Sequence, residues 1–294
     1  MNKIRKPNLL DYCLLLILAA VWASSFLAIK IVVPETGPLW LATLRVVIAF
    51  LVLLPFALYK GFIWPSSRRQ WILLTFIMLL NVVLPFFLIS WAELTLDAGV
   101  TSLLMGVGPF MAIIGSHFAT EDDKLSTAKF IGVVLGFSGV SLLVGLEIFQ
   151  GLGDNLYAQG AVLIGSACYV TSGILVRKLS GFPADRLSTL VLGFASITLI
   201  FITLIFDGLP TQNFSTNSWL GLIYLGIFPT ALGYILRYHL VQSIGVSAFS
   251  VGVNLVPVFG VLLAALFLGE VLSANLFYSL ALIVLGLFVI RLKA

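Results

Sequence analysis

Long apolar stretches, separated by short polar connections, follow one another along the whole chain. A helix needs about 20 apolar residues to cross a bilayer, and a segment in lipid must satisfy its own backbone hydrogen bonds. We expect ten such stretches, at residues 11–33, 39–59, 71–91, 99–120, 126–146, 157–176, 187–206, 219–240, 246–268 and 274–290. The sequence therefore predicts an all-α, polytopic membrane protein with ten transmembrane helices.

Composition agrees with a chain that has the lipid bilayer as its surroundings. Of 294 residues, 61% are hydrophobic and 10% are charged, whereas about 25% of residues are charged in a soluble domain. The formal charge of +4 comes from short Lys and Arg clusters between apolar stretches, which does not predict a nucleic-acid partner. Cys13 and Cys168 have no metal-ligand spacing around them, so neither a metal nor a cofactor is expected.

The distribution of cations predicts the orientation of the chain. All but two of the 16 Lys and Arg residues fall at one set of ends of the stretches, and the exceptions are Lys30 and Arg45. Because Lys and Arg in short loops stay in the cytoplasm, both termini are expected there. The alternative for the first stretch is a secretory signal peptide. Residues 22–30 have a partner at residues 169–177, however, which favours a structural helix.

An internal repeat divides the chain into two halves. Residues 91–109 match residues 237–257, with Gly99 opposite Gly245 at a shift of 146 and Pro109 opposite Pro257 at a shift of 148. We place the halves at residues 1–147 and 148–294. Five spans per half is an odd number, so the second half must enter the membrane from the opposite side. Such inverted repeats occur in many secondary transporters, which bind substrate between the halves.

Several motifs follow one another along the chain, and one of them occurs in both halves. WASSFLAIK at residues 22–30 is followed by Pro38 and Arg45, a GV[TS] motif with a later Pro occurs at residues 99–109 and 245–257, and Gly269-Glu270 precedes the last stretch. In these features the chain resembles the drug/metabolite transporter superfamily and, within it, the EamA family of ten-helix transporters, aromatic amino acid exporters among them. The first half departs from the pattern at residues 120–123, where Gly-Glu would fall.

The resemblance implies export or exchange of small metabolites, amino acids among them, across a bacterial inner membrane. It does not identify the substrate. The expected partner is therefore a small molecule, carried by alternating access of the two halves.

A polar stripe on the ninth stretch is the first candidate for a substrate site. Ser250, Asn254 and Pro257 share one helix face, and the repeat places them opposite Ser102, Gly106 and Pro109. The alternative is that these small residues only pack helices together.

Aromatic residues and hydroxyls make up the rest of the predicted site. Trp22 and Tyr169 are equivalent in the repeat, as are Ser25 and Ser172, so an aromatic pair is expected to bracket the substrate. In the eighth stretch Pro229 interrupts the helical hydrogen bonds, and Tyr234 and Tyr238 share a face. Packing and interfacial anchoring are the alternatives for these aromatics. The remaining candidate is Trp91.

Three charged residues are expected in or near the membrane at the outer ends of the stretches. Arg45 lies about 9 Å of helix rise inside its stretch and needs a counter-ion, with Glu93 or a substrate carboxylate as candidates. For Lys30 a snorkelling side chain or a fixed ion pair is favoured. We name Lys30 and Glu93 as a possible coupling site or ion pair, because no stretch has a carboxylate near its middle.

Two other classes of protein are alternatives to a transporter. Gly136-Phe137-Ser138-Gly139 reads GxSG, the nucleophile motif of an intramembrane serine hydrolase, but the two histidines fall near inner ends and serine activation needs a nearby base. Gly132, Gly136 and Gly139 also form a small-residue face, through which a homodimer could form in place of a monomer. A channel or receptor shares the composition but does not require two inverted halves.

Overall fold

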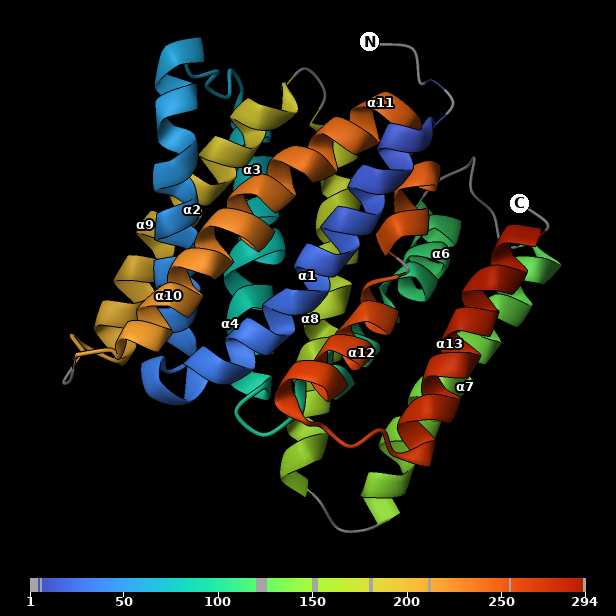
Figure 1. The fold of residues 1–294 in the computed structure, drawn as a ribbon. Helices are drawn as coiled ribbons and strands as arrows, with labels where there is room; N and C mark the ends of the chain where they lie inside the picture. The colour runs from blue at the N-terminus through green and yellow to red at the C-terminus, as the bar shows by residue number, and fades with distance from the viewer. Residues whose placement is uncertain are drawn as a thin grey trace.

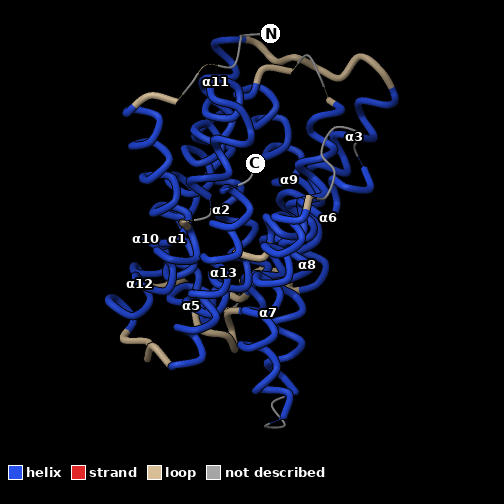
Figure 2. The backbone as a smooth tube through the Cα atoms, turned by 90° about the vertical axis from the view of Figure 1, so that its right-hand side faces the viewer, coloured by secondary structure: helices blue, strands red, loops and turns tan. Residues whose placement is uncertain are grey.

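The computed structural model describes residues 5, 7–119, 126–149, 153–179, 182–210, 213–253 and 255–292. Every regular element within those ranges is a helix (Figures 1 and 2). Six helical stretches are long and apolar enough to cross a membrane, and four shorter apolar helices accompany them. Each of the ten expected stretches corresponds to one of these, so the prediction of an all-α polytopic protein is confirmed.

The first half contains seven α-helices and one π-helical segment. They are α1 (Leu9–Thr36), α2 (Pro38–Lys60), α3 (Arg68–Met78), η1 (Leu79–Val83), α4 (Leu84–Ala92), α5 (Ala98–Met105), α6 (Gly108–Ala119) and α7 (Thr127–Phe149). The third expected stretch is thus the run from α3 to α4, and the fourth is broken between α5 and α6.

The second half repeats this order with one difference. Its elements are α8 (Gly153–Lys178), α9 (Ala184–Phe206), α10 (Thr216–Leu225), η2 (Gly226–Leu232), α11 (Gly233–Val253), α12 (Val256–Leu268) and α13 (Ala274–Leu292). The expected connection at residues 241–245 lies inside α11. It contains no proline, and Gly245 alone does not interrupt the backbone hydrogen bonds of a helix.

Equivalent helices of the two halves run in opposite directions. In Figure 1, α1 descends from the upper side while α8 ascends, and α7 descends beside the ascending α13. The start of α1 and the end of α13 consequently lie on the same side of the molecule. Two inverted five-helix repeats, as expected from the sequence, produce this arrangement.

Short sequence signals set the ends of the first helices. Asn8 caps α1 by accepting from the Asp11 amide, and the Asp11 carboxylate accepts from the Asn8 amide in return, a reciprocal arrangement that satisfies two free amides. Gly37, at φ 72°, separates α1 from α2, and Pro38 then occupies the first turn of α2. Glycine is favoured at that positive φ because it has no Cβ. The two helices therefore turn sharply without a loop.

The two π-helical segments occupy matching places in the repeat. Residues 79–83 in the third stretch and residues 226–232 in the eighth begin 147 positions apart, the same shift that relates Trp22 to Tyr169. In the second segment Pro229 has no amide to donate, which widens the turn. The Thr230 hydroxyl donates to the Leu225 carbonyl, five residues back. Widened turns of this kind leave backbone carbonyls available to other side chains.

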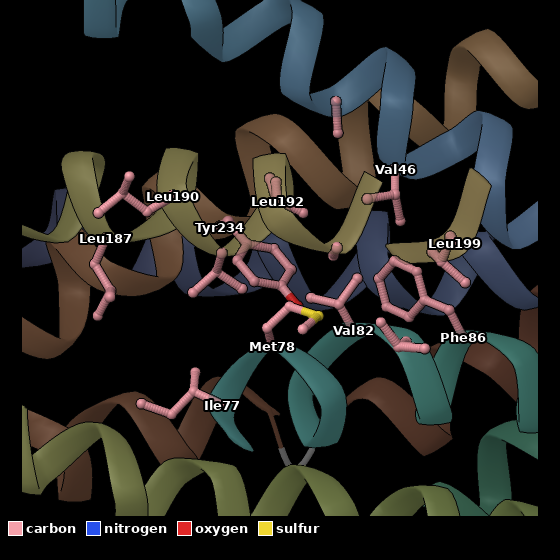
Figure 3. Packing of buried hydrophobic residues seen from close by; sticks show 14 of the residues in the cluster. Val46, Ile77, Met78, Val82, Phe86, Leu187, Leu190, Leu192, Leu199 and Tyr234 are labelled. Atoms are coloured by element: carbon pink, nitrogen blue, oxygen red, sulfur yellow. The ribbon is translucent and has the colours of Figure 1, made fainter. Parts of the chain in front are cut away.

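The buried core joins the halves to each other. One cluster combines α2 and the α3–α4 run with α9 of the second half, and Tyr234 packs within it beside Met78 and Val82 (Figure 3). On the other side of the molecule α7 packs against α13, where a Cβ at Gly139 would come within 2.8 Å of the Ser279 carbonyl oxygen. The halves therefore interlock instead of meeting at one flat surface.

Candidate functional site

A cavity of about 330 Å³ lies between the two halves. Helices α1, α2, α4, α5, α6 and α8 line it together with η2, α11 and α12. Its described walls are mostly apolar and aromatic, and such a chamber with a few polar groups is typical of small-molecule sites. Eight residues expected from the sequence line it: Trp22, Ser25, Arg45, Gly106, Pro109, Tyr169, Tyr234 and Pro257.

Other candidate residues lie elsewhere. The Ser102 hydroxyl donates to the Val256 carbonyl, and the Ser172 hydroxyl to the Tyr169 carbonyl, so both are engaged in helix contacts. Trp91 lines a separate pocket with Leu94, Thr95 and Tyr157.

The structure does not describe the side chains of three further candidate residues. Asn254 lies outside the described residues, and the side chains of Tyr238 and Ser250 are not described. Their expected roles stay predictions.

The π-helical segments position two aromatic residues of the cavity. Trp22 Nε1 donates to the Pro229 carbonyl at 3.1 Å, and the Tyr234 hydroxyl donates to the Asn81 carbonyl at 3.0 Å. Each bond joins one half to the π-helical segment of the other. The Pro229 carbonyl is therefore bound by Trp22, which fixes the indole at the cavity wall.

Arg45 is a buried cation at the cavity wall, and its direct contacts are neutral groups. Its side chain is only 5% exposed, its Nε and Nη2 donate to the Thr230 hydroxyl, and its guanidinium lies 4.0 Å from the centre of the Phe86 ring. Cation–π contacts and hydroxyl acceptors are neutral partners that leave the charge uncompensated. Within the described part of the chain no carboxylate lies within 4.0 Å of this guanidinium.

The cavity has a positive electrostatic character. Its described lining includes Arg45 and Arg237 and no Asp or Glu. A buried cation is costly unless an anion or a polar network compensates it. The site is consequently suited to a ligand that has an anionic group.

Comparisons with known proteins place these features in a family. The profile of the EamA-like transporter family matches the chain twice, at residues 9–145 and 156–292. The chain belongs to the EamA-like transporter family. The resemblance seen in the sequence is thereby confirmed, and this EamA protein is a membrane transporter.

Relatives of this EamA protein occur in bacteria, archaea and plants. The uncharacterised transporter YvbV of Bacillus subtilis is 26% identical over 294 residues, covering 98% of this chain and 93% of the relative. An uncharacterised transporter of Archaeoglobus fulgidus is 26% identical over 280 residues, 92% of this chain and 95% of that protein. A WAT1-related chloroplastic protein of Arabidopsis thaliana is 27% identical over 86% of this chain, which spans 62% of the plant protein.

A solved crystal structure has the same architecture. It superposes with a TM-score of 0.68 at 19% identity, and the match covers 97% of this chain and 98% of the other. At that identity the likeness concerns the fold alone, which is the all-helical arrangement of the EamA protein.

Several lining residues were not found by sequence reasoning. Phe86 and Phe249 line the cavity, but they are two of 23 phenylalanines and no spacing separates them from packing residues. Arg237 is one of the cations whose distribution predicts the orientation of the chain, and nothing in its spacing indicates a cavity. Asn81 does not line the cavity, but it is buried beside it in η1, and neither atom of its side-chain amide has a hydrogen-bond partner among the described residues. A lone Asn in an apolar stretch is unusual in a membrane, so the sequence did contain a signal for it.

The GxSG motif lies on the packing side of α7. A Cβ at Gly136 would come within 2.3 Å of the Phe110 ring, and Gly139 is buried against α13, whereas Ser138 between them is exposed. His239 is exposed on α11. This arrangement is that of a small-residue helix contact.

Lys30 and Glu93 lie beside the cavity without lining it. Lys30 Nζ donates to the main-chain carbonyls of Glu93 and Leu96, at 3.1 and 2.7 Å. The expected ion pair between these two side chains is not formed, since the ammonium is not within 4.0 Å of the carboxylate. Lys30 instead holds the turn between α4 and α5.

Proposed function

We propose that this EamA protein is a secondary transporter, an exporter or exchanger, of small amphipathic metabolites that carry a carboxylate. It works by alternating access across a bacterial inner membrane, with both termini in the cytoplasm. Apolar amino acids are substrates of this kind. The observation that carries the proposal is the buried Arg45, which faces an aromatic cavity and whose direct contacts among the described residues, Thr230 and Phe86, are neutral.

The lining of the cavity supports a ligand with two different ends. Trp22, Phe86 and Tyr169 offer large apolar surfaces, which stack well against a flat or aliphatic body. Arg45 offers guanidinium donors to the other end, and guanidinium matches a carboxylate in geometry and charge. A ligand that uses both would be held in one orientation.

The position of the cavity supports alternating access. Trp22 and Tyr169 are equivalent residues of the two inverted halves, and both line it. In an inverted repeat each half can adopt the conformation of the other, which opens the same site to opposite sides. A channel has no such requirement for two exchangeable halves.

A ligand-stabilisation measurement tests the substrate class. We expect L-phenylalanine to raise the Tm of the purified protein, because a ligand that binds only the folded state stabilises it. Phenethylamine, which has the same ring without the carboxylate, should not. Equal stabilisation by L-phenylalanine and phenethylamine would contradict the proposal. So would the absence of stabilisation by every member of a series of apolar amino acids.

Two variants make the test specific to Arg45. In Arg45→Gln the shift caused by L-phenylalanine should disappear, because the cation that binds the carboxylate is gone. Arg69→Gln removes an exposed cation at the start of α3 that does not line the cavity. The Tm shift that L-phenylalanine causes in this variant should equal that of the wild type. A Tm shift in Arg45→Gln as large as that of the wild type would show that the guanidinium does not bind the ligand.

A further inference from the structure

We propose that Glu93 is a proton-binding site whose protonation is linked to binding of the substrate carboxylate at Arg45. This inference rests on the proposed function, and it adds a second ligand, the proton, to the same site. Its basis is a buried carboxyl group that nothing in the surrounding described structure satisfies.

Glu93 is fully buried at the end of α4. Its side chain is 0% exposed, and neither carboxyl oxygen has a hydrogen-bond partner in the part of the chain that the structure describes. An ionised carboxylate is very costly in such a place unless donors or a paired cation compensate it, whereas the neutral acid costs far less. The geometry therefore favours a carboxyl group that binds and releases a proton during the cycle.

The nearest cation does not neutralise this group directly. Lys30 Nζ is directed at the carbonyl oxygens of Glu93 and Leu96. These bonds use the lysine to stabilise the end of α4, where the last carbonyls lack helical partners. Glu93 is held in position by this contact while its carboxyl oxygens remain unpaired.

Charged groups from three other elements act on Glu93. Lys30 of α1 and Arg45 of α2 attract the ionised form, and Glu270, in the segment before α13, repels it. On α8 the titratable Tyr157 lies beside Leu94 and Thr95 of the following turn. Because Arg45 is one of these groups, the charge state of Glu93 depends on what occupies the cavity.

The site lies next to the cavity wall. Ile89 precedes Glu93 by one helical turn, about 6 Å of rise, and Ile29 directly precedes Lys30; both isoleucines line the cavity. A substrate carboxylate at Arg45 would offset the positive charge that favours ionised Glu93. Binding of the anion and binding of the proton therefore strengthen each other, and by linkage the effect is reciprocal.

Glu93 exchanges a single proton with water in this step. The ionised carboxylate of Glu93 takes one proton from water to give the neutral acid, and it returns that proton to water when the substrate leaves. No other bond is made or broken. Protonation also removes the repulsion between Glu93 and Glu270, whose carboxylate binds the amides of Ala98 and Gly99 at the start of α5.

The first arm of the test needs no substrate. Infrared spectra of the lipid-reconstituted protein, recorded across a pH series, should show the carbonyl band of a protonated carboxylic acid that persists to neutral pH. The band should be absent in Glu93→Gln and retained in Asp97→Asn, which removes an exposed carboxyl group four residues away. A band that survives in Glu93→Gln, or no such band in the wild type, would overturn the proposal.

The second arm measures linkage with L-phenylalanine as the probe. Above the pH at which the infrared band disappears, the apparent Kd of the wild type should rise about tenfold per pH unit, as for one linked proton. In Glu93→Gln the Kd should not change over that range. A pH-independent Kd in the wild type would overturn the linkage.

The two arms separate this proposal from the proposed function. If no carboxylate probe binds at any pH, the substrate class is wrong, and the infrared titration still decides whether Glu93 binds a proton. Glutamine has the shape and charge of the protonated acid, so Glu93→Gln is expected to fold. Loss of folding in that variant would contradict the proposal, and Glu93→Asp, which keeps a carboxyl group, should keep a band that titrates.

Discussion

Gly260 of α12 lies against Ser102 of α5, at a contact between the two halves. A Cβ atom at position 260 would come within 1.8 Å of the Ser102 oxygen and 2.4 Å of its Cβ. Overpacking of a filled contact costs about 1–3 kcal/mol. We expect Gly260→Ala to lower the Tm of the purified protein, measured by its thermal unfolding.

Two further variants distinguish this contact from a general effect of alanine. At Gly173 a Cβ would meet nothing within 4 Å, so Gly173→Ala should melt with the wild type. Ser102→Gly combined with Gly260→Ala should recover much of the lost stability, because the side chain that clashes is removed. A single Gly260→Ala variant as stable as the wild type would show that the halves do not cross there.

Single residues were predictable where they contrast with their surroundings. Arg45 is noticeable because a charge in an apolar stretch is rare and needs a partner, and Trp22 and Tyr169 because the repeat makes them equivalent. Phe86 was not predictable, since its contact with Arg45 depends on how α2 and α4 pack. The bond from Trp22 to Pro229 depends likewise on a π-helical turn that no spacing in the sequence specifies.

Two helix N-termini at one end of the molecule are capped by carboxylates from the opposite half. Glu270 of the second half accepts hydrogen bonds from the Ala98 and Gly99 amides at the start of α5, at 2.8 and 2.9 Å. Glu35 of the first half accepts from the Ser215 amide and from the hydroxyls of Ser215 and Ser218 at the start of α10. Carboxylates at helix N-termini bind free amides and are stabilised by the helix dipole.

We expect Glu270→Gln to loosen the start of α5. The neutral side chain keeps one acceptor oxygen and loses the charge, and the loss of such a cap costs about 0.5–2 kcal/mol. Hydrogen exchange of the amides of residues 98–101, followed by mass spectrometry, should become faster. Asp207→Asn, an exposed carboxylate in the connection that follows α9, should leave that exchange unchanged. Unchanged exchange in Glu270→Gln would show that the cap contributes nothing.

Whole helices were the most predictable level of the structure. The ten stretches follow from the length and apolarity that a bilayer demands. The breaks inside them were less predictable, because Pro229 indicates a disturbance but not that the turn becomes π-helical. The continuous α11 was missed because a short polar stretch near the membrane surface can either end a helix or extend it.

Two equivalent connections of the halves lie on opposite faces of the molecule. In Figure 1 the connection from α2 to α3, which follows Lys60 and ends at Ser67, lies on the upper side, and the connection from α9 to α10 lies on the lower side. Lys and Arg concentrate in the cytoplasm. The upper side is therefore expected to be cytoplasmic.

Cysteine labelling tests this orientation. In a variant without Cys13 and Cys168, a cysteine at Asn213 should react with an impermeant reagent added to intact cells. A cysteine at Ser67 should react only after the membrane is opened. Asn213 is exposed, and the neighbouring Gln212 lies outside the described residues. Labelling of both positions from the same side would contradict the inverted repeat.

The inverted relation of the halves was predictable from an odd number of spans and a collinear repeat. Their interlocking was not, because it arises from contacts such as α2 with α9 and α7 with α13 that no local pattern encodes. Sequence reasoning therefore identified the two halves, and the structure shows that the cavity is built from both.

Counterflow in sealed vesicles tests most directly whether this cavity is the site of an alternating-access carrier. Purified protein is reconstituted into vesicles, with or without unlabelled L-phenylalanine inside, and uptake of the labelled compound is followed. We predict saturable uptake that is faster into preloaded vesicles, is lost in Arg45→Gln and is kept in Arg69→Gln. Uptake that rises linearly with concentration, ignores preloading or persists in Arg45→Gln would contradict the account.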